Sequence, residues 1–504
     1  MRKLIVPIVT LALLAGAYQL GTRQRAEPVV IKVPSTPAAQ FNSAGSESVG
    51  AVAQDAVRRL ATPTSGEVIL VRDGESIQDA VNRAAPGAVI KVMPGTYRET
   101  VYIDKDNITL SGVIEQGNYP VLEGDGVRND AILYSGNGTT IENFHITHYK
   151  GNGVMGQAGN NFIIRNNIVV DTGVYGIFPQ LGQNGIVSHN VLSGIEDAAI
   201  YIGMSDNVDV VYNRVFESVA GIEIENSRSA LVEANYVYNN TGGILAFVTP
   251  GLPIKTCGDV LIRNNFVIDN NHENFAVPGS IVANVPAGTG MLVMACDDVV
   301  IEGNIVTGNN SAGIIFTDFT LATNIPNDPG SEPNPNRPKL LDNLMRDNGL
   351  DPAPVVRAYL ATQLESRGPD IVDTVGMDDG CILHPARYRT IGLEKYGECA
   401  FDTTAKVATY TLPQPVPPRG LENVDIGKLT YYGICAGCHA YSVRLIGPPT
   451  QIIQALYMDN PQGIAAYARQ PVKKREDYPE MPPQQHLDGE TLLAAARYML
   501  SLKN

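Results

Sequence analysis

Two cysteines and a histidine near the C-terminus have the most specific spacing in the chain. Cys435-Ala436-Gly437-Cys438-His439 puts an imidazole directly after the second of two closely spaced thiols. Such thiols can form thioethers with both vinyl groups of a haem while the adjacent imidazole reaches the iron. A thioredoxin-like redox pair or a zinc site is the alternative for cysteines so spaced. The motif predicts one covalently bound haem c with His439 as an iron ligand.

The second iron ligand is expected to be Met481, within Tyr478-Pro479-Glu480-Met481-Pro482-Pro483. A proline-stiffened loop can hold a thioether over the iron, and Met together with His raises the reduction potential of a haem. Met458, Met499 and His486 are the competing ligands. The two methionines lie in expected helices and fit a core better, whereas His486 is close to Met481 in sequence.

Glu223 and Glu225 are the main candidates for chemistry elsewhere, with Tyr201 and Asp197 in the preceding repeat. Side chains two positions apart on a strand share a face and lie about 7 Å apart. Such a pair could hydrolyse a glycosidic bond or hold Ca²⁺. Ordinary solvation of an exposed strand also explains alternating glutamates.

A repeat runs through the middle of the chain and would position these glutamates. Its asparagines stand at intervals of 23, 23, 22, 30 and 39 residues, at Asn167, Asn190, Asn213, Asn235, Asn265 and Asn304. A period of about 22 residues is too short for a pair of helices and suits one coil of three short strands. An asparagine at a fixed turn can hydrogen-bond its counterparts in neighbouring coils. The repeat predicts a parallel β-helix over residues 66–324.

The beginning of this region combines an expected helix at 77–81 with a strand and turn at 86–97. A helix there would cover the open edge of the first coil. The sequence resembles the start of right-handed parallel β-helix proteins of the pectin-lyase-like superfamily, over about 250 residues. The resemblance implies a mainly β fold, here followed by a small all-α domain, and does not specify chemistry.

The outward side chains of one strand per coil follow from the register and include no Lys, Arg or His. Lyases and epimerases of polyuronates need cations for the substrate carboxylate and a base for the C5 proton. Residues 175–181 resemble the strand of mannuronan C5-epimerases that carries Asp-Pro-His-Asp, but Phe178, Gln180 and Leu181 replace the acids and the histidine. We therefore expect no polyuronate chemistry, and any sugar site to act on a neutral glycan through the two glutamates.

The same outward face is otherwise apolar, more so than a free monomer tolerates. Its apolar residues are Met155, Phe178, Leu245, Phe247, Leu292, Met294 and Ile315. Residues 325–420, the C-terminal domain or a partner protein could cover them. The two enlarged repeat intervals mark loops at about 247–258 and 269–289, and His272, Glu273 and Asn274 are their most polar cluster.

Cys257 and Cys296 each precede an apolar repeat position by five residues, so they occupy equivalent places in successive coils. Adjacent strands lie about 4.8 Å apart, which is within disulfide reach. Cys381 and Cys399 are the expected second pair in an oxidising compartment. Free buried thiols are the alternative.

The order of features around the haem motif resembles class I cytochromes c over residues 421–504. Residues 427–432 and 491–500 match the first and last helices, and Tyr498 of the last helix is expected to pack on the first. Gly447-Pro448-Pro449 resembles the turn whose carbonyl fixes the haem histidine, which implies a cofactor-binding role for Pro449. Three consecutive basic residues follow in the loop: Lys473, Lys474 and Arg475. They could form a patch that docks an acidic redox partner, or they could simply belong to a solvated loop.

The N-terminus has the layout of an export signal, since Arg2 and Lys3 precede an uncharged run over 4–22. That run is either cleaved or retained as an inner-membrane anchor, which predicts the periplasm or cell envelope. The net charge of −15 belongs to residues 1–420, because 421–504 hold 8 basic and 8 acidic side chains. Such a charge argues against nucleic-acid partners.

These features divide the chain into a signal peptide or anchor (1–22), a linker (23–65), the β-helix (66–324), an irregular segment (325–420) and a cytochrome c domain (421–504). The leading hypothesis is an exported electron-transfer protein, with the β-helix as scaffold and an unidentified redox partner. The alternative is a carbohydrate-active lyase, epimerase or hydrolase with a haem appendage. A structural adhesion coil is a third hypothesis, so whether the chain is an enzyme stays open.

Overall fold

The computed structural model describes residues 66–321, 328–417 and 426–503, apart from positions 437, 443, 445, 446, 479, 480, 482 and 486. The expected signal or anchor (1–22) and linker (23–65) lie outside the described residues. Within the described part, no helix has the length and apolar character needed to cross a membrane.

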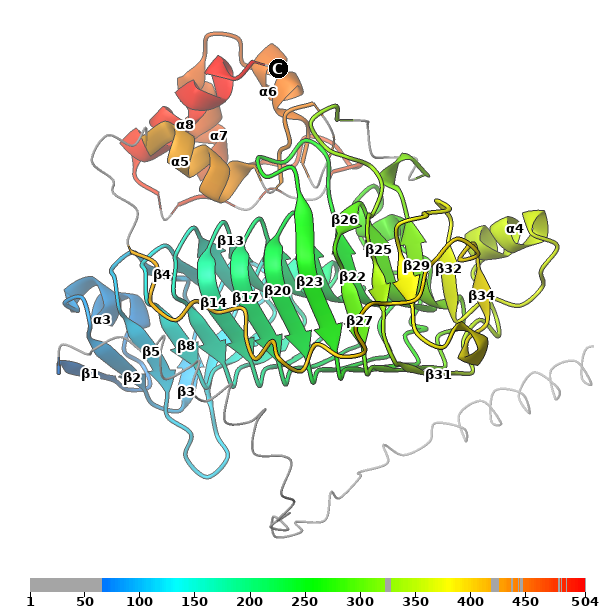
Figure 1. The fold of residues 1–504 in the computed structure, drawn as a ribbon. Helices are drawn as coiled ribbons and strands as arrows, with labels where there is room; N and C mark the ends of the chain where they lie inside the picture. Colours follow the sequence, from blue (N-terminus) through cyan, green and yellow to red (C-terminus); the bar gives the residue numbers. More distant parts are fainter. Residues whose placement is uncertain are drawn as a thin grey trace, which may run out of the picture. The chain divides into compact units, whose positions relative to one another are not determined.

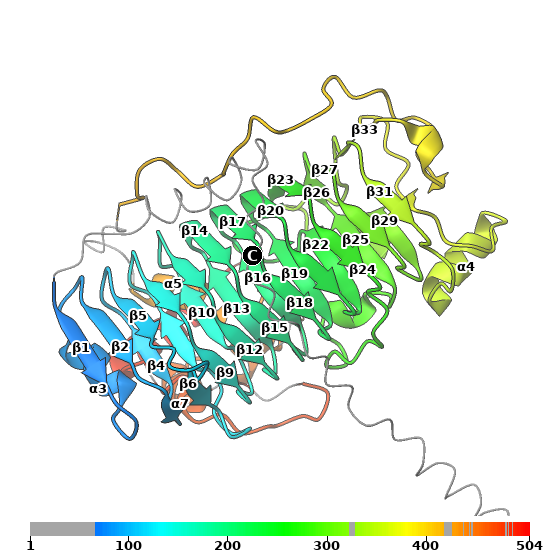
Figure 2. The same cartoon turned by 90° about the horizontal axis from the view of Figure 1, so that it is seen from below.

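Three parallel sheets wind around one core as a right-handed β-helix, each turn giving one strand to each sheet (Figures 1 and 2). Sheet A contains β1 (Val68–Val71), β2 (Val89–Val92), β5 (Thr109–Gly112), β8 (Thr140–Glu142), β11 (Ile163–Arg165), β14 (Gln183–Ser188), β17 (Asp206–Val211), β20 (Arg228–Glu233), β23 (Cys257–Arg263), β26 (Cys296–Asp297), β27 (Val300–Glu302), β30 (Lys339–Leu340) and β33 (Cys381–Ile382).

Sheet B follows sheet A in each turn and is built from three-residue or four-residue strands. Its members are β3 (Gly95–Tyr97), β6 (Pro120–Glu123), β9 (His145–Thr147), β12 (Ile168–Val170), β15 (Val191–Ser193), β18 (Arg214–Phe216), β21 (Tyr236–Tyr238), β24 (Phe266–Ile268), β28 (Ile305–Thr307) and β31 (Leu344–Arg346).

Sheet C completes the turn and carries the predicted glutamates. Its members are β4 (Val101–Ile103), β7 (Ile132–Tyr134), β10 (Val154–Gln157), β13 (Tyr175–Gln180), β16 (Ala198–Gly203), β19 (Ala220–Glu225), β22 (Gly242–Phe247), β25 (Thr289–Met294), β29 (Ala312–Thr317), β32 (Ile371–Asp373) and β34 (Thr390–Ile391).

The core is a stack of aligned apolar side chains, because every strand alternates inward and outward positions. Ile177, Ile200 and Ile222 of sheet C are fully buried in register with one another. The helix α3 (Ile77–Arg83) supplies the buried Ile77, Ala80 and Val81 near the start of the coil, as its amphipathic sequence predicts. The intervals read from the sequence are therefore the rungs of the fold.

The repeated asparagines form a buried ladder at the turn between sheets A and B. Asn190 donates through Nδ2 to Asn213 Oδ1 at 3.0 Å, and Asn213 donates to Asn235 Oδ1 at 3.0 Å. A second ladder follows sheet B and was not anticipated: Asn240, Asn270, Asn309 and Asn348. Both ladders satisfy turn backbone groups that would otherwise be buried without partners.

The coil extends beyond the boundary expected at residue 324. Strands β30, β31 and β32 pair with β27, β28 and β29, and β33 and β34 add to them. Asn343 continues the first ladder by accepting from Asn304 Nδ2 at 3.0 Å. This turn is hard to detect in the sequence, because Asn343 follows Asn304 by 39 residues and several prolines precede Lys339.

A segment at 402–416, here called the strap, runs back along sheet A (Figures 1 and 2). Its contacts follow the rungs in reverse order, from Glu302 on β27 to Asn161 before β11. Asn161 and Asn184 hold its backbone, accepting from the Val416 and Leu412 amides at 2.8 Å. No periodic pattern predicts the strap, although Asn161 and Asn184 themselves lie one repeat interval apart.

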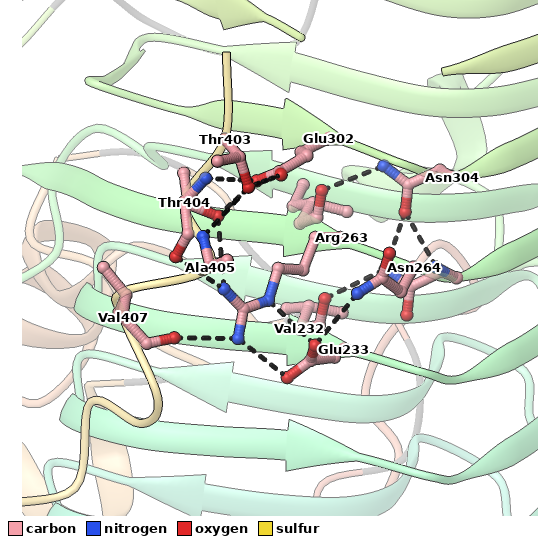
Figure 3. Close-up of polar contacts among 12 residues, drawn as sticks. Val232, Glu233, Arg263, Asn264, Glu302, Asn304, Thr403, Thr404, Ala405 and Val407 are labelled. Atoms are coloured by element: carbon pink, nitrogen blue, oxygen red, sulfur yellow. Dashed lines mark hydrogen bonds and ion pairs between the residues drawn. The ribbon is translucent and has the colours of Figure 1, made fainter. Parts of the chain in front are cut away.

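The strap is anchored by a buried ion pair (Figure 3). Arg263 binds both carboxylate oxygens of Glu233, at 2.8 and 3.1 Å, and donates to the carbonyl oxygens of Thr404 and Val407. Glu302 accepts from the Thr404 amide at 2.9 Å. The guanidinium thus neutralises a buried carboxylate and satisfies strap carbonyls simultaneously.

Residues 426–503 are helical, as expected for the C-terminal domain. The helices are α5 (Ile426–Thr430), the π-helical turn η4 (Tyr431–Cys435), α6 (Thr450–Leu456), α7 (Pro461–Arg469) and α8 (Gly489–Ser501). Tyr498 of α8 contacts the rings of Tyr431 and Tyr432. The remaining helical segments are α4 (Pro354–Thr362), η1 (Val282–Asn284), η2 (Phe319–Leu321) and η3 (Pro385–Arg387).

Both expected disulfides are present, Cys257–Cys296 and Cys381–Cys399. The first joins in-register residues of β23 and β26. Disulfides fit an extracellular or periplasmic compartment.

Candidate functional site

The outward face of sheet C holds three buried carboxyl groups. Glu223 and Glu225 lie on β19, and Asp197 directly precedes β16 on the neighbouring rung. Their exposed fractions are only 2%, 7% and 8% for Glu223, Glu225 and Asp197. Ordinary solvation of an exposed strand therefore does not explain these glutamates.

Burial strongly perturbs this carboxyl cluster. It raises the pKa of Asp197 to about 8, and the Glu225 charge adds to that rise. Burial and the Asp197 charge raise the pKa of Glu223 well above its usual value, and burial raises that of Glu225 to about 7. Neighbouring carboxyls in low dielectric cannot all ionise together. The cluster therefore holds a proton near neutral pH.

Tyr201 orients one member of the cluster by donating its hydroxyl hydrogen bond to Glu225. Its ring stacks on Phe178, with centroids 4.3 Å apart, and Tyr175 packs on both rings. The missing side chain of Gly203 makes room, because a Cβ there would lie 2.9 Å from Tyr201 Cζ. Packing thus fixes the tyrosine that positions the carboxylate.

The side chains of two glutamines on the same face lack hydrogen-bond partners among the residues that the structure describes. Gln157 and Gln180 are adjacent in register, 6% and 0% exposed, and their four amide atoms lack hydrogen bonds within the described part of the chain. Glu223 Oε1 and Asn152 Oδ1 are likewise buried without a hydrogen bond in the described part of the chain. Buried polar groups without partners cost free energy unless water or a ligand satisfies them. In the sequence, Gln180 is notable only because it replaces a catalytic residue of the epimerase strand. No sequence pattern predicts its burial.

The expected apolar strip is covered by parts of the chain itself. Met155, Phe178, Leu245, Phe247, Met294 and Ile315 are all buried, and Leu292 is half-buried. Ile281 and Val285 of the loop between β24 and β25 pack against this side, and Tyr359 of α4 packs beside Ile315. Ala440, next to His439, packs with Met204 and Leu252. The loop itself is a cover that the sequence did not suggest.

A cleft of about 760 Å³ opens beside Asp197. Turns after five sheet B strands form one wall, including His148, Asp171, Glu196 and Glu217. The loop containing His272 and Ser280 and the side chain of Arg444 line the rest. The other two residues of the polar cluster predicted in this loop do not line the cleft. Asn274 donates hydrogen bonds to the Val282 and Val285 carbonyls within the loop, and Glu273 is exposed. The cleft connects one catalytic candidate, Asp197, with solvent.

A second cavity, of about 450 Å³, lies in the helical domain and fits a haem. It is mostly apolar and is lined by Cys435, Cys438, His439 and Met481, with aliphatic residues such as Ile453, Ile464, Leu492 and Met499. Neither cysteine is in a disulfide. Burial raises both thiol pKa values to about 12, so neither is a ready thiolate of the thioredoxin kind. The predicted attachment and ligand residues therefore surround one cavity.

His439 is held by the carbonyl of Pro448, 2.8 Å from Nδ1. A proton on Nδ1 leaves Nε2 free to bind iron. The acceptor belongs to Pro448 rather than to Pro449, which precedes α6 and lines the cavity. Met458 is 76% exposed and does not line the cavity, and His486 lies outside the described residues.

The basic patch beside this cavity is compensated locally. Lys473 pairs with Glu476 at 3.2 Å and Arg475 pairs with Asp477 at 2.7 Å. Lys474 donates to Tyr457 Oη at 2.8 Å. In the described ranges, no group of three or more His, Cys, Asp or Glu side chains is arranged to hold a metal ion.

A family model described as right handed beta helix region matches residues 100–249 and 220–325. No curated protein matches the chain. Solved β-helix structures include an alginate lyase from Paenibacillus sp. str. FPU-7, with 15% identity over 57% of this chain and 100% of that chain, at a TM-score of 0.42.

Two further similar structures are also carbohydrate-active proteins. DFA-IIIase from Arthrobacter chlorophenolicus A6 has 13% identity, covers 68% of this chain and 100% of that chain, and gives a TM-score of 0.43. A mannuronan C-5 epimerase A-module from Azotobacter vinelandii has 14% identity over 61% of this chain and 93% of that chain, with a TM-score of 0.34. These similarities concern the fold of the coil and not its chemistry.

Proposed function

We propose that the chain is an exported carbohydrate-active protein that hydrolyses a neutral glycan on sheet C, with a c-type haem module attached. The buried cluster of Asp197, Glu223 and Glu225 supports this most directly. A protonated and an ionised carboxyl side by side are the groups that glycosidic hydrolysis requires.

Each group has a role in this proposal. Glu223, whose protonated form is the more favoured, donates a proton to the leaving oxygen. Glu225, oriented by Tyr201, acts as the base or nucleophile. The unpaired amides of Gln157 and Gln180 bind sugar hydroxyls. The excess of carboxyls disfavours an anionic polymer by charge repulsion.

The test is hydrolysis of a panel of neutral polysaccharides by the full chain. We expect Glu223→Gln and Glu225→Gln each to lower kcat/KM at least a hundredfold, as loss of an acid or base does. Asp347→Asn, on a distant rung, is the matched control and should retain activity. Alginate and pectate should give no unsaturated ends. Turnover of either polymer, or full activity of both glutamine variants, contradicts the proposal.

We infer that the helical domain would hold one haem c through Cys435 and Cys438, with His439 and Met481 as the residues that would bind the iron. The Pro448–His439 hydrogen bond and the apolar cavity support this. When bound, the haem accepts and donates single electrons, and an unidentified redox partner would exchange them. His439 is positioned by Pro448, while Ile464, Leu492 and Met499 exclude water.

Haem stoichiometry and spectra test this assignment. Holoprotein from cells with a haem-attachment system should contain one covalent haem per chain. Met481→Ala should remove the near-infrared band of Met-ligated ferric haem and lower the potential. Met458→Ala, at an exposed position, is the control. An unchanged spectrum in Met481→Ala would exclude this ligand.

A further inference from the structure

We propose that the carboxyl cluster of sheet C and the haem site form one proton-coupled redox unit, in which the cluster takes up a proton when the iron is reduced. This inference rests on the haem binding proposed above. It assigns the cluster a second role, in setting the redox equilibrium of the helical domain.

The attachment side of the haem cavity adjoins the cluster. Burial raises the pKa of Cys438, and the charges of Asp130 and Asp197 add to that rise. The Cys438 charge likewise adds to the rise that burial causes in the pKa of Tyr175, so these groups lie within electrostatic range of one another. Ala440 packs with Met204 and Leu252, which fixes this side of the domain against the coil. A haem joined to Cys438 would therefore be attached within electrostatic range of Asp197.

The surroundings allow the cluster to change protonation near neutral pH. Buried carboxyls close to one another share protons, and a nearby positive charge favours their ionised forms. Oxidised iron carries one more positive charge than reduced iron, so reduction favours proton uptake. The groups facing the cluster are Asp130, Tyr175, Tyr201 and Cys438, and across the cleft His148, Lys150, Asp171, Glu196, Glu217, His272 and Arg444.

Charge is balanced in the coupled step. With haem held by the chain, a one-electron donor protein would reduce ferric to ferrous iron, while one carboxylate of the cluster would take up a proton and become a carboxylic acid. The proton comes from water in the cleft that Asp197 lines. Reoxidation by an acceptor protein reverses both changes.

Coupling of this kind works in both directions. If reduction favours protonation of the cluster, then the proposed catalytic acid is more fully protonated in the reduced protein. The hydrolytic pH profile should therefore move to higher pH on reduction. The haem would then regulate the glycan site without taking part in bond cleavage.

The experiment is a spectroelectrochemical titration of the full holoprotein between about pH 6 and about pH 9. We expect the reduction equilibrium constant to fall at least threefold over this range, about 28 mV at 59 mV per tenfold change. Asp197→Asn should lose at least half of this dependence, and Asp197→Glu should restore it. Glu225→Gln should also weaken it.

Two controls separate other titrating groups. Asp347→Asn removes a carboxylate on a distant rung and should keep the full dependence. His272→Gln should do the same, which distinguishes the cluster from a histidine across the cleft. An unchanged pH dependence in both Asp197→Asn and Glu225→Gln overturns the inference while leaving haem binding intact. A chain that binds no haem refutes the proposed function of the helical domain instead.

Discussion

Gly203 is the residue whose lack of a side chain shapes the carboxyl cluster. A Cβ there would lie 2.8 Å from Phe178 Cε2 and 2.9 Å from Tyr201 Cζ. Gly203→Ala should therefore displace Tyr201 from Glu225 and lower the free energy of unfolding by about 1–3 kcal/mol. Denaturant unfolding measures this. Gly397→Ala, which meets no atom within 4 Å, should change stability little; equal losses would show that crowding is not the cause.

Asp197 should make stability depend on pH. Its pKa is raised to about 8 in the folded chain, so the folded state binds more protons than the unfolded state above the ordinary Asp pKa. Stability must then fall as pH rises toward 8, by up to about 1.4 kcal/mol per pH unit for one group. Asp197→Asn should be more stable than the parent at pH 8 and not at pH 4, by thermal unfolding. A stabilisation independent of pH would argue against this origin.

The sequence predicted where these side chains point but not how they are buried. Alternation along β19 places Glu223 and Glu225 on one outward face, and that much follows from register. The groups that pack onto the coil come from parts distant in sequence: Ile281 and Val285 pack against its buried apolar cluster, and Ala440 packs with Met204 and Leu252. No local pattern encodes contacts made across such separations.

Among the elements, the asparagine ladder should behave as a cooperative unit. Asn213 donates to Asn235 Oδ1 and Val187 O, and accepts from Asn190. Asn213→Ala leaves several buried groups unpaired and should cost about 2–4 kcal/mol. Chemical denaturation gives the value. Asn284→Ala, at an exposed turn, is the control, and comparable losses in both would contradict a special role of the ladder.

The strap depends on Arg263. Arg263→Met leaves Glu233 charged and buried and strips the Thr404 and Val407 carbonyls of a donor. We expect a loss of about 3–5 kcal/mol and rapid proteolysis within 402–416. The double variant Arg263→Met with Glu233→Leu should recover part of the stability. If the double variant is no more stable than Arg263→Met, the buried charge is not the cause.

The element boundaries show which signals a sequence can carry. The asparagine intervals are a local pattern and predict the turns of the coil. The amphipathic sequence that begins at residue 77 is also local and predicts the helix there. The strands after residue 338 are two or three residues long and stand among prolines, so their pairing depends on the turns already formed. The strap shows no periodicity in its own sequence. The residues that repeat are those of the coil's rungs, to which the strap binds.

For the molecule as a whole, the two disulfides close loops of different length. Cys257–Cys296 spans 39 residues and Cys381–Cys399 spans 18. Each disulfide restricts the unfolded chain and so raises the free energy of unfolding, by about 4 kcal/mol for the longer loop and about 3 kcal/mol for the shorter one. Unfolding of the Cys257→Ser/Cys296→Ser and Cys381→Ser/Cys399→Ser double variants tests this order. A larger loss in the second would show that native contacts around Cys381 and Cys399 dominate.

The strap also determines how the molecule would respond to mechanical load. Its contacts lie on successive rungs, so a pull at residue 416 loads the Asn161 contact first, then that of Asn184, then that of Asp209. The contacts would break one at a time, at low force, rather than together in shear. Each rupture would lengthen the tether of the C-terminal helices by a few residues. The attachment would thus yield in steps while the coil stays intact.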